Sequence, residues 1–312
     1  MITFRTALTA ATALLATGAP AMAEVTGRVA SRGFLDPAGP VAQAQLHHFG
    51  VIIAIMMLVV VPIFIAVPLL VWRYRRGGKG AYRPKWDFDS AVETTIWGFP
   101  LVIVAILAVA LWGYTFRFDP YRPLGDDPIE VEVVALDWKF LFIYPEQGIA
   151  TVDMLAIPAG RPVTLKLTSG TVMQSFMIPQ LAGQIYAMAG MQTQLNLLGE
   201  RAGHYVGRNT QYNGNGFHAQ SFMTEVMEPS YFDQWVELQR TTPATLDWAG
   251  YEQLAQPGLM PAPVIYGSVE PGIFTRILTS FVPAMGEMKH ALHGPEKGMS
   301  MTHDHGRTEA RP

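Results

Sequence analysis

The sequence contains no cysteine among its 312 residues. Without a thiol, the chain cannot form a disulfide, hold an iron–sulfur cluster, supply thiolate ligands to a metal, or use a cysteine nucleophile. A lipid anchor on an N-terminal cysteine is excluded for the same reason. Cross-links and metal sites built on sulfur anions are therefore ruled out.

Charged residues are also scarce: they make up 15% of the chain, whereas 50% of its residues are hydrophobic. This is too apolar for a purely soluble globule and indicates one soluble domain together with membrane segments. The formal net charge is -3, and the basic residues form no long stripe. A nucleic-acid partner is therefore not expected.

The first 23 residues have the pattern of a secretory signal peptide. Arg5 precedes a short apolar run over residues 7–16, and Ala21-Met22-Ala23 is a small-x-small cleavage site. The alternative is an uncleaved anchor, but this run is shorter than the roughly 17 residues that cross a bilayer. We therefore expect residues 1–23 to direct export of the N-terminus.

Two stretches, residues 49–72 and 94–116, contain no charged residue. At about 1.5 Å per residue, each helix would cross a hydrocarbon core of about 30 Å with some tilt. Pro62 and Pro68 lie in the first stretch and predict a kink, which helices in lipid tolerate. Buried helices of a soluble domain are the alternative, but uncharged runs of this length rarely occur in a soluble core.

A short basic loop separates the two stretches, and such loops stay on the cytoplasmic side of the membrane. Its basic residues are Arg73, Arg75, Arg76, Lys79, Arg83 and Lys85. Residues 24–116 are therefore predicted to form a transmembrane hairpin with its loop inside. The mature N-terminus and everything after Arg117 are then outside, as the signal peptide also requires.

Beyond the hairpin, the pattern is that of a β-domain. Residues 129–133 and 163–168 alternate apolar and polar side chains, which predicts half-buried strands. Frequent turn residues follow, so residues 117–230 are predicted to form an all-β Greek-key sandwich.

Residues 231–284 have helical periodicity and are expected to pack on the sandwich or on a neighbouring subunit. Residues 285–312, rich in His and Met, are expected to form a flexible tail.

Four blocks in the β-domain are distinctive. They are Asp-Trp-Lys-Phe at 137–140, Ile-Tyr-Pro-Glu-Gln-Gly-Ile-Ala at 143–150, Ser-Phe-Met-Ile-Pro at 175–179 and Gln-Ile-Tyr-Ala-Met-Ala-Gly-Met-Gln-Thr at 184–193. In this order and on this side of the membrane, they closely resemble subunit II of cytochrome bo-type ubiquinol oxidases. With the hairpin, the resemblance covers about residues 45–282 and implies a cupredoxin-like sandwich.

The resemblance also supplies a test for copper. Cytochrome c oxidase members of the wider heme-copper oxidase family bind a dinuclear copper centre through an H-S-x-x-x-P block and a C-x-E-x-C-x-x-x-H-x-x-M block. A mixed-valence copper pair needs bridging thiolates, which amides cannot replace. The resemblance therefore predicts that this chain binds no cofactor. The matching positions are Gln174, Asn209, Gln211, Asn213, Phe217 and Gln220.

A domain without copper fits an oxidase that takes electrons directly from quinol in the membrane. The resemblance thus implies a non-catalytic subunit II of a quinol-oxidising, oxygen-reducing proton pump in the bacterial inner membrane. Its expected partners are the oxidase subunits I, III and IV, membrane lipid and the quinol pool. Heme and copper are expected in subunit I, whose assembly and stability this chain would support.

Glu93 lies just before the second uncharged stretch, at the cytoplasmic surface. In the family, the matching glutamate marks the mouth of the lysine-lined proton channel of subunit I. A carboxylate at a membrane boundary can collect protons for a buried relay. Stabilisation of a helix N-terminus by a negative charge is the alternative, and both remain open.

Further residues near the lost ligand positions have simpler interpretations. Trp138 and Phe140 match an aromatic segment that receives electrons in copper-bearing relatives, but without copper they are predicted to pack or to contact subunit I. His218 and Met223 are off register, so His218 is interpreted as a solvated turn residue.

Metal binding by the His/Met tail leaves a membrane-tethered copper-handling protein as a competing hypothesis. A cytochrome c oxidase subunit would require the missing ligands.

Overall fold

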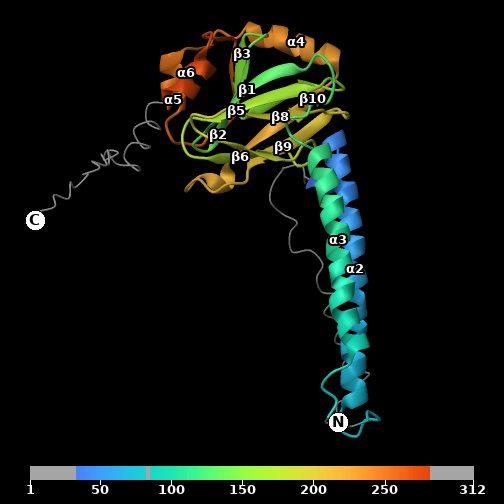
Figure 1. Cartoon of the computed structure of the whole chain (residues 1–312). Coiled ribbons are helices and arrows are strands. Elements are labelled where there is room, and N and C mark those ends of the chain that lie inside the picture. The colour runs from blue at the N-terminus through green and yellow to red at the C-terminus, as the bar shows by residue number, and fades with distance from the viewer. Residues whose placement is uncertain (1–32, 82–84, 282–312) are drawn as a thin grey trace, which may run out of the picture. The chain divides into compact units, whose positions relative to one another are not determined.

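The computed structural model describes residues 33–81 and 85–281 (Figure 1). It starts with a short 3-10 helix, η1 (Gly33–Leu35), and ends just after α6 (Ile273–Ser280). The signal peptide predicted over residues 1–23 and the tail predicted over residues 285–312 lie outside the described residues.

Two long helices, α2 (Pro40–Tyr74) and α3 (Ser90–Arg117), precede the β-domain. Both are long and apolar enough to cross a membrane, and almost no residue of their apolar segments is buried within the chain. The two predicted membrane spans are thus found. α2 continues through Pro62 and Pro68 without ending, and the kink there stays a prediction.

Both helices begin before the predicted membrane spans. α2 starts at Pro40 rather than at residue 49, because proline is favoured in the first turn and residues 41–48 contain no helix breaker. α3 starts at Ser90 rather than at residue 94, because Asp89 caps it: Oδ1 accepts the N–H groups of Ala91 at 3.0 Å and Val92 at 3.1 Å. The uncharged runs indicate only the lipid-embedded part, whereas each helix extends beyond it.

Among the described residues, six strands form one large sheet and five form another, which confirms the predicted sandwich. The β1–β5 and β4–β10 pairs are parallel, and the other pairs in these sheets are antiparallel. The first sheet has the order β12 (Val264–Tyr266), β3 (Ile149–Val152), β2 (Lys139–Tyr144), β1 (Ile129–Leu136), β5 (Val163–Ser169), β8 (Thr193–Leu197). The second has the order β4 (Met154–Pro158), β10 (Ser221–Met227), β9 (Gly203–Asn209), β6 (Gln174–Met177), β7 (Gln184–Ala187).

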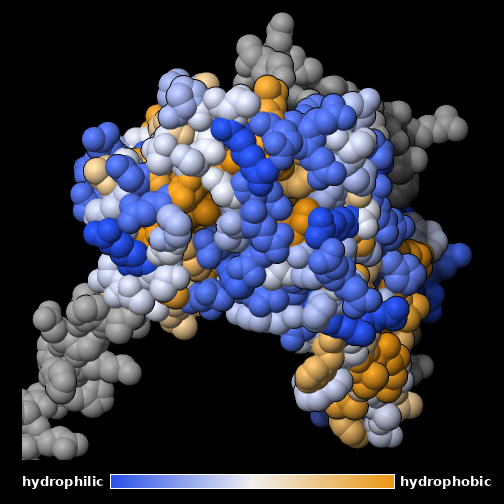
Figure 2. All heavy atoms as spheres, turned by 90° about the horizontal axis from the view of Figure 1, so that it is seen from above, coloured by the Kyte–Doolittle hydropathy of each residue, from blue (hydrophilic) through white to orange (hydrophobic). Residues whose placement is uncertain are grey.

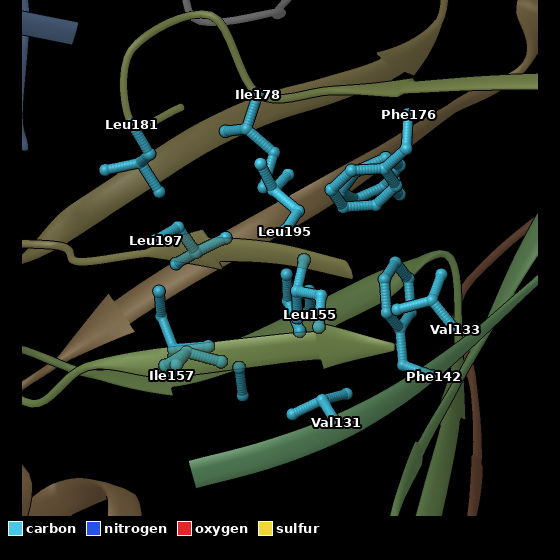
Figure 3. Packing of buried hydrophobic residues seen from close by; sticks show 14 of the residues in the cluster. Val131, Val133, Phe142, Leu155, Ile157, Phe176, Ile178, Leu181, Leu195 and Leu197 are labelled. Atoms are coloured by element: carbon cyan, nitrogen blue, oxygen red, sulfur yellow. The ribbon is translucent and has the colours of Figure 1, made fainter. Parts of the chain in front are cut away.

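Buried apolar side chains from both sheets fill the space between them (Figure 3). An aromatic group forms part of this core. Phe176 stacks on Phe222 with ring centroids 4.9 Å apart, and Phe140 meets Phe222 edge-on at 5.0 Å. Gly207 leaves room for the Phe222 ring, since a Cβ there would lie 2.0 Å from it. The core thus depends on close contact between rings and backbone.

A second apolar core covers the outer face of the first sheet. The covering side chains come from the segment that follows the sandwich in the sequence. Its elements are α5 (Trp248–Leu254), α6 and a small parallel pair of strands, β11 (Thr245–Leu246) and β13 (Ser268–Val269). Tyr251 and Ile277 of these elements belong to the same buried cluster as Leu141 and Val152 of the sheet. The preceding helix, α4 (Pro229–Arg240), buries Phe232 in the core between the sheets. The segment therefore packs on the sandwich, one of its two predicted locations, but it also contains strands and is helical only in part.

The residues just before α2 are bound to the β-domain. The Ala38 N–H donates to the Gln180 carbonyl at 2.8 Å, and the Ala38 carbonyl accepts from the Glu200 N–H at 2.9 Å. Gly39 lies so close to the Leu198 carbonyl that a Cβ would be 2.2 Å from its oxygen. Ala38 itself is part of the core between the sheets.

The surfaces of the helices and of the β-domain differ. Most of the large hydrophobic side chains that are exposed belong to α2 and α3. On the face shown in Figure 2, hydrophilic residues predominate and hydrophobic residues gather in separate patches. This difference fits a domain in water that is attached to helices in lipid.

Asp153 lies where the chain passes from β3 in the first sheet to β4 in the second. Its Oδ1 accepts the Phe140 N–H at 2.8 Å. Burial raises the pKa of Asp153 to about 7, against the opposing effects of this hydrogen bond and of Lys139. The folded state therefore binds this proton more tightly than the unfolded chain does. The resulting stabilisation is complete below about pH 4 and is lost as the pH rises through about 7.

Asp153→Asn is expected to reduce the loss of stability between about pH 5 and pH 8. Asparagine keeps the accepting oxygen, cannot ionise, and tolerates the positive φ of 57° at this position. The difference in the pKa of Asp153 between the folded and the unfolded chain corresponds to at most about 4 kcal/mol of folding free energy. Thermal unfolding of the purified chain across this pH range measures the effect, with Asp126→Asn in an exposed loop as control. Parallel pH curves for wild type and Asp153→Asn would contradict the expectation.

Candidate functional site

Four of the six predicted ligand-replacement positions come together at one end of the sandwich. Gln174 begins β6, Asn209 ends β9, and Gln220 lies immediately before β10, so neighbouring strands bring these three amides together. Asn213 comes from the loop between β9 and β10. Gln174, Asn209 and Gln220 are almost completely buried, with 0%, 4% and 2% of their surface exposed. We call these four residues the amide cluster.

Gln220 is the centre of the amide cluster. Its Nε2 donates to Gln174 Oε1 at 2.7 Å and to the Leu136 carbonyl at 3.2 Å. Its Oε1 accepts from Asn209 Nδ2 and from Asn213 Nδ2, both at 2.9 Å. All hydrogen-bonding atoms of this buried side chain are therefore used, as burial of an amide requires.

Gln174 ties the amide cluster to β1 and to the loop before β6. Its Nε2 donates to the Leu136 carbonyl at 3.0 Å and lies 3.2 Å from Thr171 Oγ1. Thr171 Oγ1 in turn donates to Asp137 Oδ1 at 2.9 Å. The Leu136 carbonyl thus accepts from both glutamines and joins the end of β1 to the second sheet.

Asn209 holds the backbone at two places, near the start of β6 and just after the end of β9. Its Oδ1 accepts the N–H groups of Ser175 and Gln211, both at 2.9 Å. Asn213 Oδ1 is buried and has no hydrogen-bond partner among the described residues. The cluster is thus fully bonded except at this one oxygen.

The other two predicted positions lie outside the amide cluster. Gln211 contributes its backbone N–H rather than its side chain. Phe217, which begins the 3-10 helix η2 (Phe217–Ala219), meets the ring of Tyr212 edge-on at 5.7 Å. The predicted positions therefore divide into four that form a network and two that do not.

Trp138 packs against the loop that carries Asn213. Its indole Nε1 donates to the Asn213 carbonyl at 3.3 Å. Gly216 lies directly against the ring, because a Cβ there would be 2.2 Å from the indole Cδ2. Phe140 is fully buried in the core between the sheets. Both residues pack within the chain, as predicted for them.

His218 and Met223 do not join the amide cluster. His218 is exposed in η2, and its Nδ1 lies 3.1 Å from the Asn215 carbonyl. Met223 lies within β10, opposite Val206 of β9 and Met154 of β4. Within residues 33–81 and 85–281, His, Asp and Glu side chains form no group of three or more that could hold a metal ion.

The sequence interpretation missed several partners of the amide cluster. Leu136, Thr171 and Ser175 each bond to a cluster residue, through a carbonyl, a hydroxyl and a backbone N–H respectively. Leu136 and Ser175 bond to the cluster through backbone groups, which nearly all residue types share. Their part in the cluster could therefore not be predicted from the sequence. The loop position of Thr171, three residues before Gln174, was the only available indication.

Glu93 lies in the first turn of α3, just before the second uncharged stretch. Its Oε2 accepts the indole N–H of Trp97, one turn later, at 3.0 Å. Trp97 is itself 73% exposed within the chain. The carboxylate thus has a fixed partner at the N-terminal end of α3, where the helix dipole also favours negative charge.

Comparisons with known proteins identify the relatives of this chain. Residues 102–229 match the family described as cytochrome C oxidase subunit II, periplasmic domain, and residues 240–285 match the COX Aromatic Rich Motif. The chain is 43% identical over 252 residues to ubiquinol oxidase subunit 2 of Acetobacter aceti, covering 79% of this chain and 82% of the relative. It is 41% identical over 250 residues to cytochrome bo(3) ubiquinol oxidase subunit 2 of Pseudomonas putida, covering 79% and 80%.

The quinol oxidase subunit 2 of Bacillus subtilis is 34% identical over 238 residues, which cover 75% of this chain and 74% of the relative. These matches extend well beyond the distinctive blocks of the β-domain. The predicted resemblance is therefore confirmed, and the chain belongs to the subunit II family of heme-copper oxidases, among its ubiquinol oxidase members.

Proposed function

We propose that this chain is the subunit II of a quinol-oxidising, oxygen-reducing, proton-pumping terminal oxidase, and that it carries no redox centre of its own. Heme and copper belong to subunit I in this proposal, and subunits III and IV complete the complex. Subunit I takes electrons directly from the membrane quinol pool. The N-terminus and the β-domain lie in the periplasm, and the chain supports assembly and stability of subunit I.

The amide cluster is the observation that carries this proposal. A dinuclear copper centre requires bridging thiolates, and the sequence has no cysteine. The side chains of the amide cluster do not fit such a centre, because their amide groups bond to one another and to the backbone. Without a copper acceptor, the domain has no way to pass electrons from a soluble donor. This favours a lipid-soluble donor.

The amide cluster serves as a structural cross-link in this proposal. Its bonds join the end of β1, the start of β6, the end of β9 and the loop before β10. Buried hydrogen bonds of this kind strengthen one another, and each is costly to leave half made. The loops at this end of the sandwich therefore keep a defined shape for contact with subunit I.

Glu93 is the candidate for a second role, proton entry to subunit I. The hairpin loop before it carries several basic residues, which favours a cytoplasmic position for this end of α3. The hydrogen bond from Trp97 restricts the rotamers of the carboxylate. A carboxylate fixed in this position can accept protons from water and release them to a relay in the neighbouring subunit.

Purification in mild detergent by a C-terminal tag tests the main proposal. We expect heme-bearing partners to copurify, the complex to reduce oxygen with quinol, and the chain released from the complex to contain no copper. Oxygen uptake and metal content of each separated subunit are the measurements. A copper-loaded chain that is purified alone would instead support the copper-handling hypothesis.

Gln220→Leu is expected to destabilise the domain by several kcal/mol, because each buried group that it leaves unpaired costs about 1–3 kcal/mol. Gln211→Leu is the matched control, since its side chain lies outside the cluster. Thermal unfolding of the purified complex measures the loss. The yield of assembled oxidase should fall, while quinol turnover per heme in the assembled fraction stays unchanged. A fall in turnover per heme with normal stability would contradict a structural role.

Glu93→Ala is expected to slow turnover several-fold while the complex still assembles, because proton delivery rather than folding is impaired. Asp87→Ala, at an exposed carboxylate before α3 that is not the helix cap, is the control. Quinol-driven oxygen uptake and proton pumping in vesicles are the measurements. Unchanged rates for both in Glu93→Ala would remove the proton-entry role and leave only helix stabilisation.

A further inference from the structure

A cavity of about 240 Å³ lies beside the C-terminal end of α3. Val41 and Gln45 of α2 form one side, and Leu195 of β8 forms another. Arg117, the last residue of α3, and Arg122, in the segment that follows, also line it. The cavity therefore combines an apolar wall with two guanidinium groups.

The two guanidinium groups lack carboxylate partners in the described part of the chain. Four other arginines each form an ion pair with an aspartate or glutamate, whereas Arg117 and Arg122 do not. Asp119 also lines the cavity, but its Oδ1 accepts the Tyr121 N–H at 2.9 Å and its carbonyl accepts the Arg122 N–H at 3.0 Å. The cavity thus has an excess of positive charge, which favours an anionic ligand.

The position of the cavity along α3 indicates where that anion comes from. Trp112 and Phe116 are 71% and 64% exposed, and their rings lie 5.0 Å apart. Exposed aromatic rings at the end of a membrane helix favour the headgroup region of the bilayer. Arg117 follows these rings directly, so its guanidinium is expected at the depth of the lipid phosphates when α3 spans the membrane.

We propose that this cavity binds the phosphodiester of a phospholipid from the leaflet on the side of the β-domain. Arg117 and Arg122 would hold the phosphate oxygens, since a planar guanidinium can donate two parallel hydrogen bonds to a phosphate. Val41 and Leu195 would contact the glycerol and the start of the acyl chains. The proposal depends on α2 and α3 spanning the membrane and not on the oxidase reaction.

The test uses the whole complex, stripped of lipid in detergent and titrated with phosphatidylglycerol while native mass spectrometry counts bound lipid. The double variant Arg117→Gln/Arg122→Gln is expected to bind the lipid at least about tenfold more weakly than wild type, because two charge-assisted contacts are lost. Arg208→Gln is the matched control, because Arg208 is exposed on β9 and has no ion pair in the described part of the chain. It should bind lipid as wild type does.

Three outcomes overturn the proposal. The first is unchanged lipid binding in the double variant. The second is loss of a protein subunit with lipid retained, which would show that a partner's acidic group fills the cavity. The third is competition by inorganic phosphate at the same concentration as the lipid, which would show a site for a free anion. If the double variant does not assemble, Arg117→Gln and Arg122→Gln are measured singly, and each must weaken lipid binding.

Discussion

Burial of the first sheet on both faces is the constraint on which the architecture depends. A strand with only one covered face alternates apolar and polar residues, but a doubly covered strand must be apolar throughout. All six residues of β2 are buried, and five of them are Phe, Leu, Ile or Tyr. The exception is Lys139 at its start, whose Nζ donates to the Gln256 carbonyl at 2.8 Å. The helices after the sandwich are therefore an integral part of the domain, because without them the outer faces of Leu141 and Val152 would be left in water.

The amide cluster solves a related problem at the end of the sandwich. Loops that converge on one point need interactions that fix their positions. A metal ion fixes them by coordination, whereas amides fix them by directional hydrogen bonds. Gln220 contacts residues from three other segments, and both of its polar atoms are satisfied. A domain can thus keep its shape when its redox task has moved to another subunit, which is how the proposed function connects with the fold.

Sequence periodicity predicted the membrane helices and the first strands well. In β1, Glu130 and Glu132 are half-buried and alternate with buried Ile129, Val131 and Val133, as predicted, but the strand's last four residues are all buried. Double burial depends on segments more than a hundred residues away, which a local pattern cannot reveal. The same limit applies to the site: the ligand positions came from family motifs, whereas the partners, such as the Leu136 carbonyl, depend on tertiary contacts. The helices extend beyond the predicted spans because Pro40 and Asp89, which lie at their starts, are outside the apolar runs.

The attachment of Ala38 has a consequence for the order of events during biosynthesis. Ala38 belongs to the core of the domain, yet it precedes both membrane helices in the chain. In the topology proposed above, the sandwich is therefore complete only when the segment before α2 lies on the same side of the membrane as the β-domain. Correct insertion of the hairpin then becomes a condition for finishing the core of the domain.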